Sequence, residues 1–159
     1  MSLSEFDLIR QYFASATDAR PDVFLGIGDD CALLSPPVGS CLAVTMDTLV
    51  EGRHFSSGAD PASLGHKALA VNLSDLAAMG AEPAWAALAL TLPRADVDWL
   101  RGFSAGFGAL AAEHGVQLVG GDTTRGPLSI TVHVHGFIDP AAALTRGGAN
   151  AGDRLFLSG

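Results

Sequence analysis

Apolar residues recur along this chain with two different periods, which together predict a mixed α/β fold. A helical period runs through Ala62–Met79, which Gly80 stops, and through Val97–His114, which Gly115 stops. Strict alternation of apolar and polar residues runs through Leu128–Phe137, as in a strand with one buried face. The pattern therefore predicts two long amphipathic helices and a half-buried strand.

Shorter segments complete the predicted elements. A first helix is expected over Ser4–Ala16, because Ser2 and Glu5 have the spacing of a capping box. Apolar runs between turn residues predict the remaining strands: Val23–Ile27, a hairpin of Cys31–Leu34 with Cys41–Met46, Trp85–Leu92 and Gln117–Val119. Trp85–Leu92 is apolar on both alternating faces, so it should be covered on both sides. We expect an α+β fold with a mixed, mainly antiparallel sheet and its helices on one face.

The length of 159 residues favours a single domain over residues 1–159. The final residues, Arg154–Gly159, have the pattern of a strand that runs into a glycine turn. A chain of this class that ends where a strand begins is more typical of one half of a larger protein than of a finished one. We therefore expect a second half beyond the present sequence.

Composition excludes several classes of protein. Apolar residues make up 48% and charged residues 16%, as in a compact globular domain. The net charge of −8, with Lys67 as the single lysine, argues against a nucleic-acid partner because no basic surface can form. The sequence has neither an apolar run of about 18 residues nor a secretory signal, so we expect a cytoplasmic protein without a membrane partner. Cys31 and Cys41 have no metal-binding spacing and are expected to be buried, reduced thiols.

Four separated aspartates interrupt this apolar, charge-poor sequence. They are Asp30, Asp47, Asp75 and Asp122. A carboxylate in apolar surroundings is costly to desolvate unless a cation offsets its charge. Carboxylates gathered from several elements beside glycine-rich turns can hold Mg²⁺ and, through it, a polyphosphate. The pattern therefore predicts a Mg²⁺-dependent phosphate site.

Two of these motifs are ambiguous when taken singly. Gly26–Asp30 allows a tight turn that aims two carboxylates into one site, but an ordinary turn with solvated aspartates explains it equally well. Asp47 closes an apolar run and is expected at a strand end, where Thr45 and Thr48 add oxygen donors. Such an aspartate is most often a turn cap, so neither motif alone identifies a site.

Asp75 gives a stronger signal. It lies three residues after Asn72 on the same predicted helix, so the two side chains share a face. The neighbouring positions are apolar, which leaves this helix without the broad polar stripe that a solvated face needs. A functional carboxylate is the favoured interpretation, and an internal hydrogen bond from Asn72 or Ser74 is the alternative.

The segment Gly120–Gly126 joins two predicted strands. Its paired glycines let backbone N–H groups approach a phosphate, and Arg125 offers a positive charge. A hairpin turn without a ligand is the alternative. Arg146 stands in a loop without periodic pattern, where an arginine is usually solvated but can bind a phosphate or stack on a base.

The histidines divide into two groups. His54 shares the loop after Asp47 with Arg53, whereas His133 and His135 fall on the polar face of the alternating strand. We interpret the strand histidines as interface or surface groups. Spacing singles out no pair of nucleophile and base, so covalent catalysis is not indicated.

Taken together, the motifs resemble the N-terminal half of the thiamine-monophosphate kinase family. This family lies in the superfamily of ATP-using enzymes that includes aminoimidazole ribonucleotide synthetase and selenophosphate synthetase. The resemblance covers nearly the whole chain, and Lys67–Ala81 and Gly120–Gly126 are its most specific segments. The other matching segments are Gly26–Ala32, Asp47–Phe55 and Thr145–Gly148.

The resemblance implies transfer of the γ-phosphate of ATP to thiamine monophosphate, giving thiamine diphosphate by direct in-line transfer. It implies several Mg²⁺ ions, ATP as co-substrate, and a homodimer in which the sheets of two copies pair into a barrel. The implied metal ligands are Asp30, Thr45, Met46 (through its backbone carbonyl), Asp47, Asp75 and Asp122. The implied ATP-binding residues are Gly121, Asp122 and Arg146, and the implied substrate-binding residue is His54.

The family's second half supplies further residues and is absent from these 159 residues. The resemblance therefore implies an N-terminal ATP- and Mg²⁺-binding dimerisation domain, which alone binds nucleotide weakly and turns over poorly or not at all. Two alternatives are a sister enzyme of the superfamily with a different acceptor, and a non-catalytic metal-binding dimerisation module.

Overall fold

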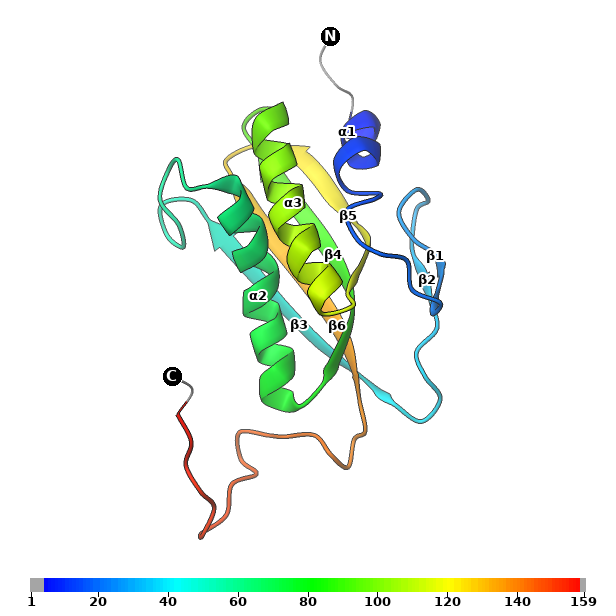
Figure 1. The fold of residues 1–159 in the computed structure, drawn as a ribbon, viewed down its shortest axis with the longest axis vertical. Helices are drawn as coiled ribbons and strands as arrows, with labels where there is room; N and C mark the ends of the chain where they lie inside the picture. Colours follow the sequence, from blue (N-terminus) through cyan, green and yellow to red (C-terminus); the bar gives the residue numbers. More distant parts are fainter. Residues whose placement is uncertain (1–4, 158–159) are drawn as a thin grey trace.

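The computed structural model describes residues 5–157 (Figure 1). Its elements follow in the order α1 (Glu5–Tyr12), β1 (Val23–Leu25), β2 (Leu33–Leu34), β3 (Cys41–Val50), α2 (Pro61–Met79), β4 (Glu82–Leu92), α3 (Val97–Glu113), β5 (Gln117–Arg125) and β6 (Ser129–Ile138).

A four-stranded sheet in the order β3-β6-β4-β5 is the centre of the fold. β6 pairs antiparallel with both β3 and β4, whereas β4 and β5 are parallel and are connected through α3. β1 and β2 form a separate antiparallel pair. The predicted mixed, mainly antiparallel sheet is confirmed.

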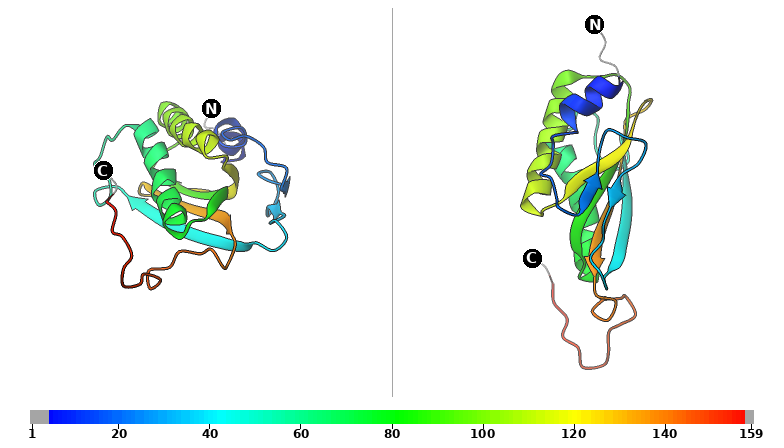
Figure 2. Two further views of the ribbon diagram at one scale, coloured as in Figure 1. Left: turned by 60° about the horizontal axis from the view of Figure 1, so that its bottom comes forward. Right: turned by 90° about the vertical axis from the view of Figure 1, so that its right-hand side faces the viewer.

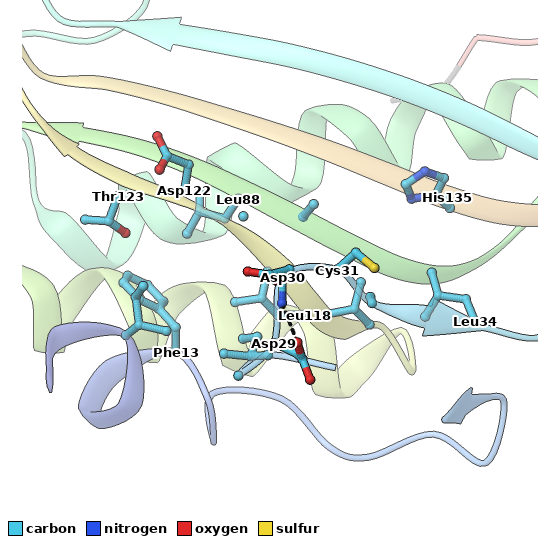
Figure 3. A pocket seen from close by; sticks show the side chains of 18 residues that line it. Phe13, Asp29, Asp30, Cys31, Leu34, Leu88, Leu118, Asp122, Thr123 and His135 are labelled. Carbon is cyan, nitrogen blue, oxygen red and sulfur yellow. Dashed lines mark hydrogen bonds between the residues drawn. The ribbon is translucent and has the colours of Figure 1, made fainter. Parts of the chain in front are cut away.

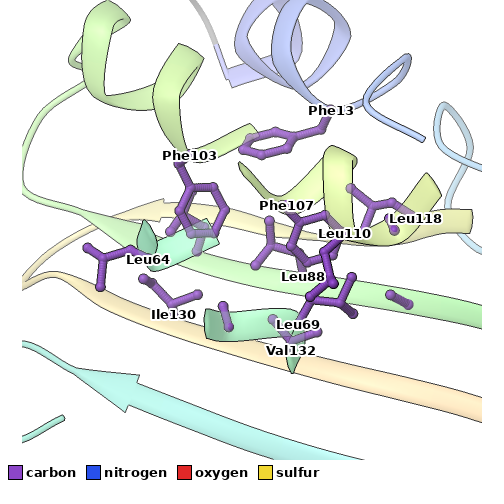
Figure 4. Packing of buried hydrophobic residues seen from close by; sticks show 14 of the residues in the cluster. Phe13, Leu64, Leu69, Leu88, Phe103, Phe107, Leu110, Leu118, Ile130 and Val132 are labelled. Atoms are coloured by element: carbon purple, nitrogen blue, oxygen red, sulfur yellow. The ribbon is translucent and has the colours of Figure 1, made fainter. Parts of the chain in front are cut away.

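Both long helices lie on the same face of this sheet (Figures 1 and 2). α2 begins at Asp60, whose carboxylate accepts a hydrogen bond from the Ser63 amide at 2.8 Å, and ends at Gly80, whose φ of 76° suits glycine. The main core fills the space between helices and sheet (Figure 4). It includes Leu69, Phe103 and Phe107 from the helices and Leu88, Ile130 and Val132 from the strands.

The opposite face of the sheet is only partly covered. Trp85 and Val119 are buried there beneath Val23 and Leu34 of the small β1–β2 pair. Trp85 also packs edge-on against Phe137, with ring centroids 4.9 Å apart. The prediction that the strand of Trp85 is covered on both sides is therefore right at Trp85, but farther along the same strand Ala89 is exposed.

One predicted strand pairing and two predicted strand ends are wrong, because pairing partners far along the chain decide them. The hairpin of Cys31–Leu34 with Cys41–Met46 does not form: β2 pairs with β1, and β3 pairs with β6 along its whole length. β3 continues to Val50, so Asp47 lies inside a strand and not at its end. β5 likewise continues through Gly120 and Gly121 to Arg125, because β4 offers it a parallel partner throughout.

The structure also differs from the predictions near the ends of the chain and at the two cysteines. α1 ends at Tyr12, before the predicted Ala16, and the capping box of Ser2 with Glu5 lies outside the described side chains. Residues 154–157 form no strand. Cys31 and Cys41 are free, as predicted, but both are exposed and not buried. In the described part of the chain no helix is both long and apolar enough to cross a membrane.

Candidate functional site

A cavity of about 610 Å³ lies where the segment after β1 passes β5 (Figure 3). Asp30 and Asp122, which belong to separate elements, both line it, and Gly121 contributes backbone. The structure therefore brings together three of the residues predicted for metal and ATP. No role at this site was predicted for Phe13, Cys31 or His135, which also line the cavity.

Asp30 is carried by the glycine-rich turn that the sequence singled out. Gly28 has a φ of 128°, which side chains disfavour, and the Asp30 amide donates to the Asp29 carboxylate at 2.8 Å. Both aspartates are exposed and line the cavity, but the Asp29 carboxylate already accepts this local hydrogen bond.

Gly121 has a structural reason to be glycine. Its φ is 149°, and a Cβ at this position would clash with the Leu88 backbone of the neighbouring parallel strand. Asp122 follows directly and is exposed. The close approach of β4 and β5 is therefore enough to explain why residue 121 is glycine, and no ligand is needed for that explanation. Asp122, the next residue, lines the cavity.

A second group of predicted residues lies on β3 and α2. The Thr45 hydroxyl donates to the Asp75 carboxylate at 2.8 Å. Asp75 is exposed, whereas Asn72 is fully buried and donates to the Ala68 carbonyl oxygen at 3.1 Å. The partner of Asp75 is thus Thr45, and not Asn72 or Ser74 as the alternative interpretation proposed.

Strand alternation separates the three neighbouring β3 residues. Leu49 is buried beneath the helices, so Thr45 and Asp47 lie on the helix side of β3. Met46 points to the opposite side, where 64% of it is exposed. Only the backbone of Met46 is therefore near the side on which Thr45 and Asp47 lie.

The two groups of residues lie at opposite edges of the sheet. β3 and β5 are the edge strands, with β6 and β4 between them. Three inter-strand spacings of about 4.8 Å separate the edges by roughly 14 Å, which is too far for shared coordination of one ion. Accordingly, the described residues of one chain contain no group of three or more His, Cys, Asp or Glu placed to hold a metal.

His54 lies in a compact turn after β3. The amides of Arg53 and His54 donate to the Val50 carbonyl oxygen at 3.1 and 2.9 Å, and the Gly52 amide donates to the Phe55 carbonyl oxygen at 2.8 Å. The Val50 amide donates to His54 Nδ1 at 3.0 Å. The Lys67 ammonium group donates to the His54 carbonyl oxygen at 2.7 Å. Sequence analysis missed Lys67, although its being the single lysine was a usable signal.

Arg146 does not line the cavity of Asp30 and Asp122. It is exposed in the segment after β6, two residues beyond Leu144, whose amide donates to the Met79 carbonyl oxygen at 3.0 Å. The structure therefore ties the start of this segment to the end of α2 but does not place Arg146 with the other predicted ATP-binding residues.

None of the four predicted aspartates forms an ion pair with another described residue. The ion pairs found among the described residues join Arg20 with Asp22, Arg94 with Asp96 and Arg101 with Asp98. In the described part of the chain, Asp30, Asp47, Asp75 and Asp122 thus form no ion pair with a basic side chain. Their oxygen donors fit a hard cation such as Mg²⁺.

Comparison with known proteins identifies the family of this chain. The family model of AIR synthase related protein, N-terminal domain, matches residues 28–138, which include β2 and the whole four-stranded sheet but not β1. The chain belongs to this family. Within it, the predicted resemblance to thiamine-monophosphate kinases is confirmed by similarity over the full length of the chain.

The similar proteins are all longer than this chain. Thiamine-monophosphate kinase of Escherichia coli K12 is 56% identical over 159 residues, which are 100% of this chain and 49% of that protein. The crystal structure of thiamine-monophosphate kinase from Stenotrophomonas maltophilia K279a matches with a TM-score of 0.79 and 53% identity, over 90% of this chain and 45% of that one. A structure of AaThiL complexed with AMPPCP and TMP matches with a TM-score of 0.67 and 32% identity, over 78% and 40% of the two chains. The chain thus spans about half the length of the relatives it matches.

Proposed function

We propose that this chain is the part of a thiamine-monophosphate kinase that holds Mg²⁺ and the phosphates of ATP. The observation that carries the proposal is the meeting of Asp30, Gly121 and Asp122 at one cavity in a chain 56% identical to such a kinase. The relative complexed with AMPPCP and TMP supports an ATP-dependent transfer to thiamine monophosphate.

Mg²⁺ fits the donors that this chain offers. The proposed ligands are Asp30, Asp47, Asp75 and Asp122, together with the Thr45 hydroxyl and the Met46 carbonyl. None of the four carboxylates has a basic partner in the described structure. When bound, Mg²⁺ neutralises phosphate charge, which carboxylates cannot do alone. The carboxylates would hold Mg²⁺, which in turn would position the phosphates, and Arg146 offers a further charged donor for the nucleotide.

A second copy of the chain explains how ligands at opposite edges serve one site. If two sheets pair so that the β3 edge of one copy meets the β5 edge of the other, Asp47 and Asp75 of one copy come to Asp30 and Asp122 of its partner. The exposed side of β3 supports this pairing, because it is apolar for most of its length. Its exposed fractions are 46% for Leu42, 52% for Val44 and 64% for Met46. The proposed homodimer is the barrel that the resemblance implies.

The decisive experiment joins this chain to the remaining half of the Escherichia coli relative and assays the chimera with ATP, Mg²⁺ and thiamine monophosphate. We expect thiamine diphosphate to form, and we expect the chain alone to give little or none. An Asp122→Asn chimera is the matched control, because it keeps the side-chain shape and removes one proposed ligand.

Each other outcome assigns a different function. Consumption of ATP with a different phosphate acceptor, but not with thiamine monophosphate, would make this chain part of a sister enzyme. A folded, dimeric chimera without turnover, whose Asp122→Asn variant still binds nucleotide equally well, would indicate a non-catalytic module.

A further inference from the structure

Contacts with the rest of the fold hold the turn that carries His54. The half-buried Phe55 ring of the turn packs against the main core, and the Glu51 amide donates to the Leu128 carbonyl oxygen at 3.4 Å. In addition Lys67, in the first half of α2, donates from its ammonium group to the His54 carbonyl oxygen at 2.7 Å. The contact spans 13 residues and joins the turn to a rigid helix. Lys67 therefore fixes the backbone of the very residue predicted to meet the substrate.

The contacts inside the turn determine how the His54 ring is presented. A backbone amide can only donate, so the Val50 amide requires Nδ1 of His54 to be an acceptor without a proton. In a neutral imidazole the proton then resides on Nε2. His54 therefore presents an N–H donor on the side of the ring away from the turn, which suits a phosphate oxygen.

We propose that Lys67 is a positioning residue, which holds the 50–55 turn so that His54 presents its Nε2–H to the phosphate group of the substrate. This inference rests on the proposed function for the identity of the substrate, but not for the arrangement of the turn. Lys67 acts through the His54 backbone, and its exposed ammonium group also brings a positive charge to this edge of an acidic protein.

The first test needs no enzymatic activity. Hydrogen exchange of the Val50 amide and the ¹⁵N shifts of the His54 ring are measured by NMR in the chain, with a His54→Gln variant to assign the ring signals. We expect a protected Val50 amide and the Nε2–H form of His54. In Lys67→Met we expect exchange of the Val50 amide to accelerate about tenfold, with buried β6 amides such as Val132 unchanged.

Two further variants separate the loss of a positive charge from the loss of the hydrogen-bond donor at position 67. Arg94→Met removes the same charge from an arginine whose side chain is 81% exposed and pairs with Asp96, so it should leave the Val50 amide unchanged. Lys67→Arg keeps a donor of similar reach and should restore most of the protection.

The second test measures the reaction. In the chimera, Lys67→Met should raise the KM for thiamine monophosphate about tenfold while kcat and the KM for ATP stay within about twofold. Unchanged Val50 exchange in Lys67→Met would overturn the positioning role, whatever the kinetics. If exchange is unchanged but turnover falls, Lys67 acts directly on the substrate; if exchange accelerates in a chimera without any turnover, the positioning stands and the proposed function fails.

Discussion

Asp22 forms an ion pair and several hydrogen bonds within the described structure, whereas the four aspartates of the candidate site form no ion pair there. Its carboxylate accepts two hydrogen bonds from Arg20, at 2.8 and 3.0 Å, and one from the Trp85 indole at 3.0 Å. Arg20 also donates to the Gly115 carbonyl oxygen. The pair fastens the segment that leads to Asp30 onto the β4–β5 side of the fold. The hydrogen bonds from Arg20 are the main reason that the pKa of Asp22 is lowered.

Asp22→Asn should therefore lower the free energy of unfolding by about 1–3 kcal/mol at pH 7. Because the pKa of Asp22 is lower in the folded state, its contribution is complete above the unfolded pKa of about 4 and is lost as the pH falls through the folded pKa. Urea denaturation from pH 7 to pH 2 checks this: the difference between wild type and variant should stay constant down to about pH 4 and then shrink.

The control for this prediction is Asp98→Asn. Asp98 pairs with Arg101 on the surface of α3, and its side chain is 89% exposed, so the substitution should hardly change the free energy of unfolding. Equal effects of the two substitutions at pH 7 would contradict the role assigned to Asp22.

Asp75→Asn tests a carboxylate that we expect to serve the reaction and not the stability of the fold. Asparagine keeps an oxygen that can accept from Thr45, and the site is exposed, so the melting temperature should not change. Turnover of the chimera should fall by at least about a hundredfold, because the substitution removes a proposed metal ligand. Calorimetry and the kinase assay measure the two effects separately; unfolding of the variant would instead indicate a structural role for Asp75.

Among the elements, α2 and α3 depend on glycine where they cross. A Cβ at Gly65 would clash with the Phe103 backbone, and one at Gly106 would clash with the Ala62 backbone. The helices can therefore approach until their backbones touch, which places Phe103 and Phe107 deep in the core. Helix propensity alone would favour alanine at both positions, so packing overrides it here.

Gly106→Ala should lower the free energy of unfolding by about 1–3 kcal/mol or prevent folding, although alanine favours a helix. Ala109→Gly, at an exposed position of the same helix, is the matched control and should cost only about 1 kcal/mol through propensity. Thermal and urea denaturation of both variants decide the matter: stabilisation by Gly106→Ala would mean that the helices are not in close contact.

The sequence predicted elements well where their signals are local. α2 was found from its apolar period and its stop at Gly80, and the alternation of β6 identified its buried face. The predicted hairpin of β2 with β3 failed because strand pairing is non-local: β3 pairs with β6, so Cys41 lies opposite Ile138. The two apolar runs on either side of the turn do not show that β3 pairs instead with a strand about 80 residues farther along the chain.

For the molecule as a whole, sequence analysis identified the candidate residues but not their arrangement. Asp30 and Asp122 meet at a cavity, whereas Asp47 and Asp75 lie at the other edge of the sheet. This separation depends on the strand order β3-β6-β4-β5, which no local pattern encodes. The same strand order is the reason for the proposal of a site shared by two chains.

A complementation experiment tests the two-chain site. Chimeras with Asp47→Asn and with Asp122→Asn should each be nearly inactive. When the two are mixed and allowed to exchange subunits, a mixed dimer should contain one site with both substitutions and one site with neither, so activity should return to a substantial fraction of that of the unsubstituted chimera. Kinase assay of the mixture measures this. The absence of any recovery, with subunit exchange verified by mass spectrometry, would place all ligands of a site on one chain.

β6 follows the other described strands along the chain and yet lies second in the sheet, between β3 and β4. As the polypeptide leaves the ribosome, β3 therefore has no strand to pair with until residues 129–138 emerge. Until then the backbone hydrogen-bonding groups along both edges of this long, largely apolar strand are unpaired. The sheet can close only by insertion of β6, so this domain should fold in one cooperative step once residues 129–138 have emerged. During that interval the nascent chain depends on chaperones more than the stability of the finished domain would suggest.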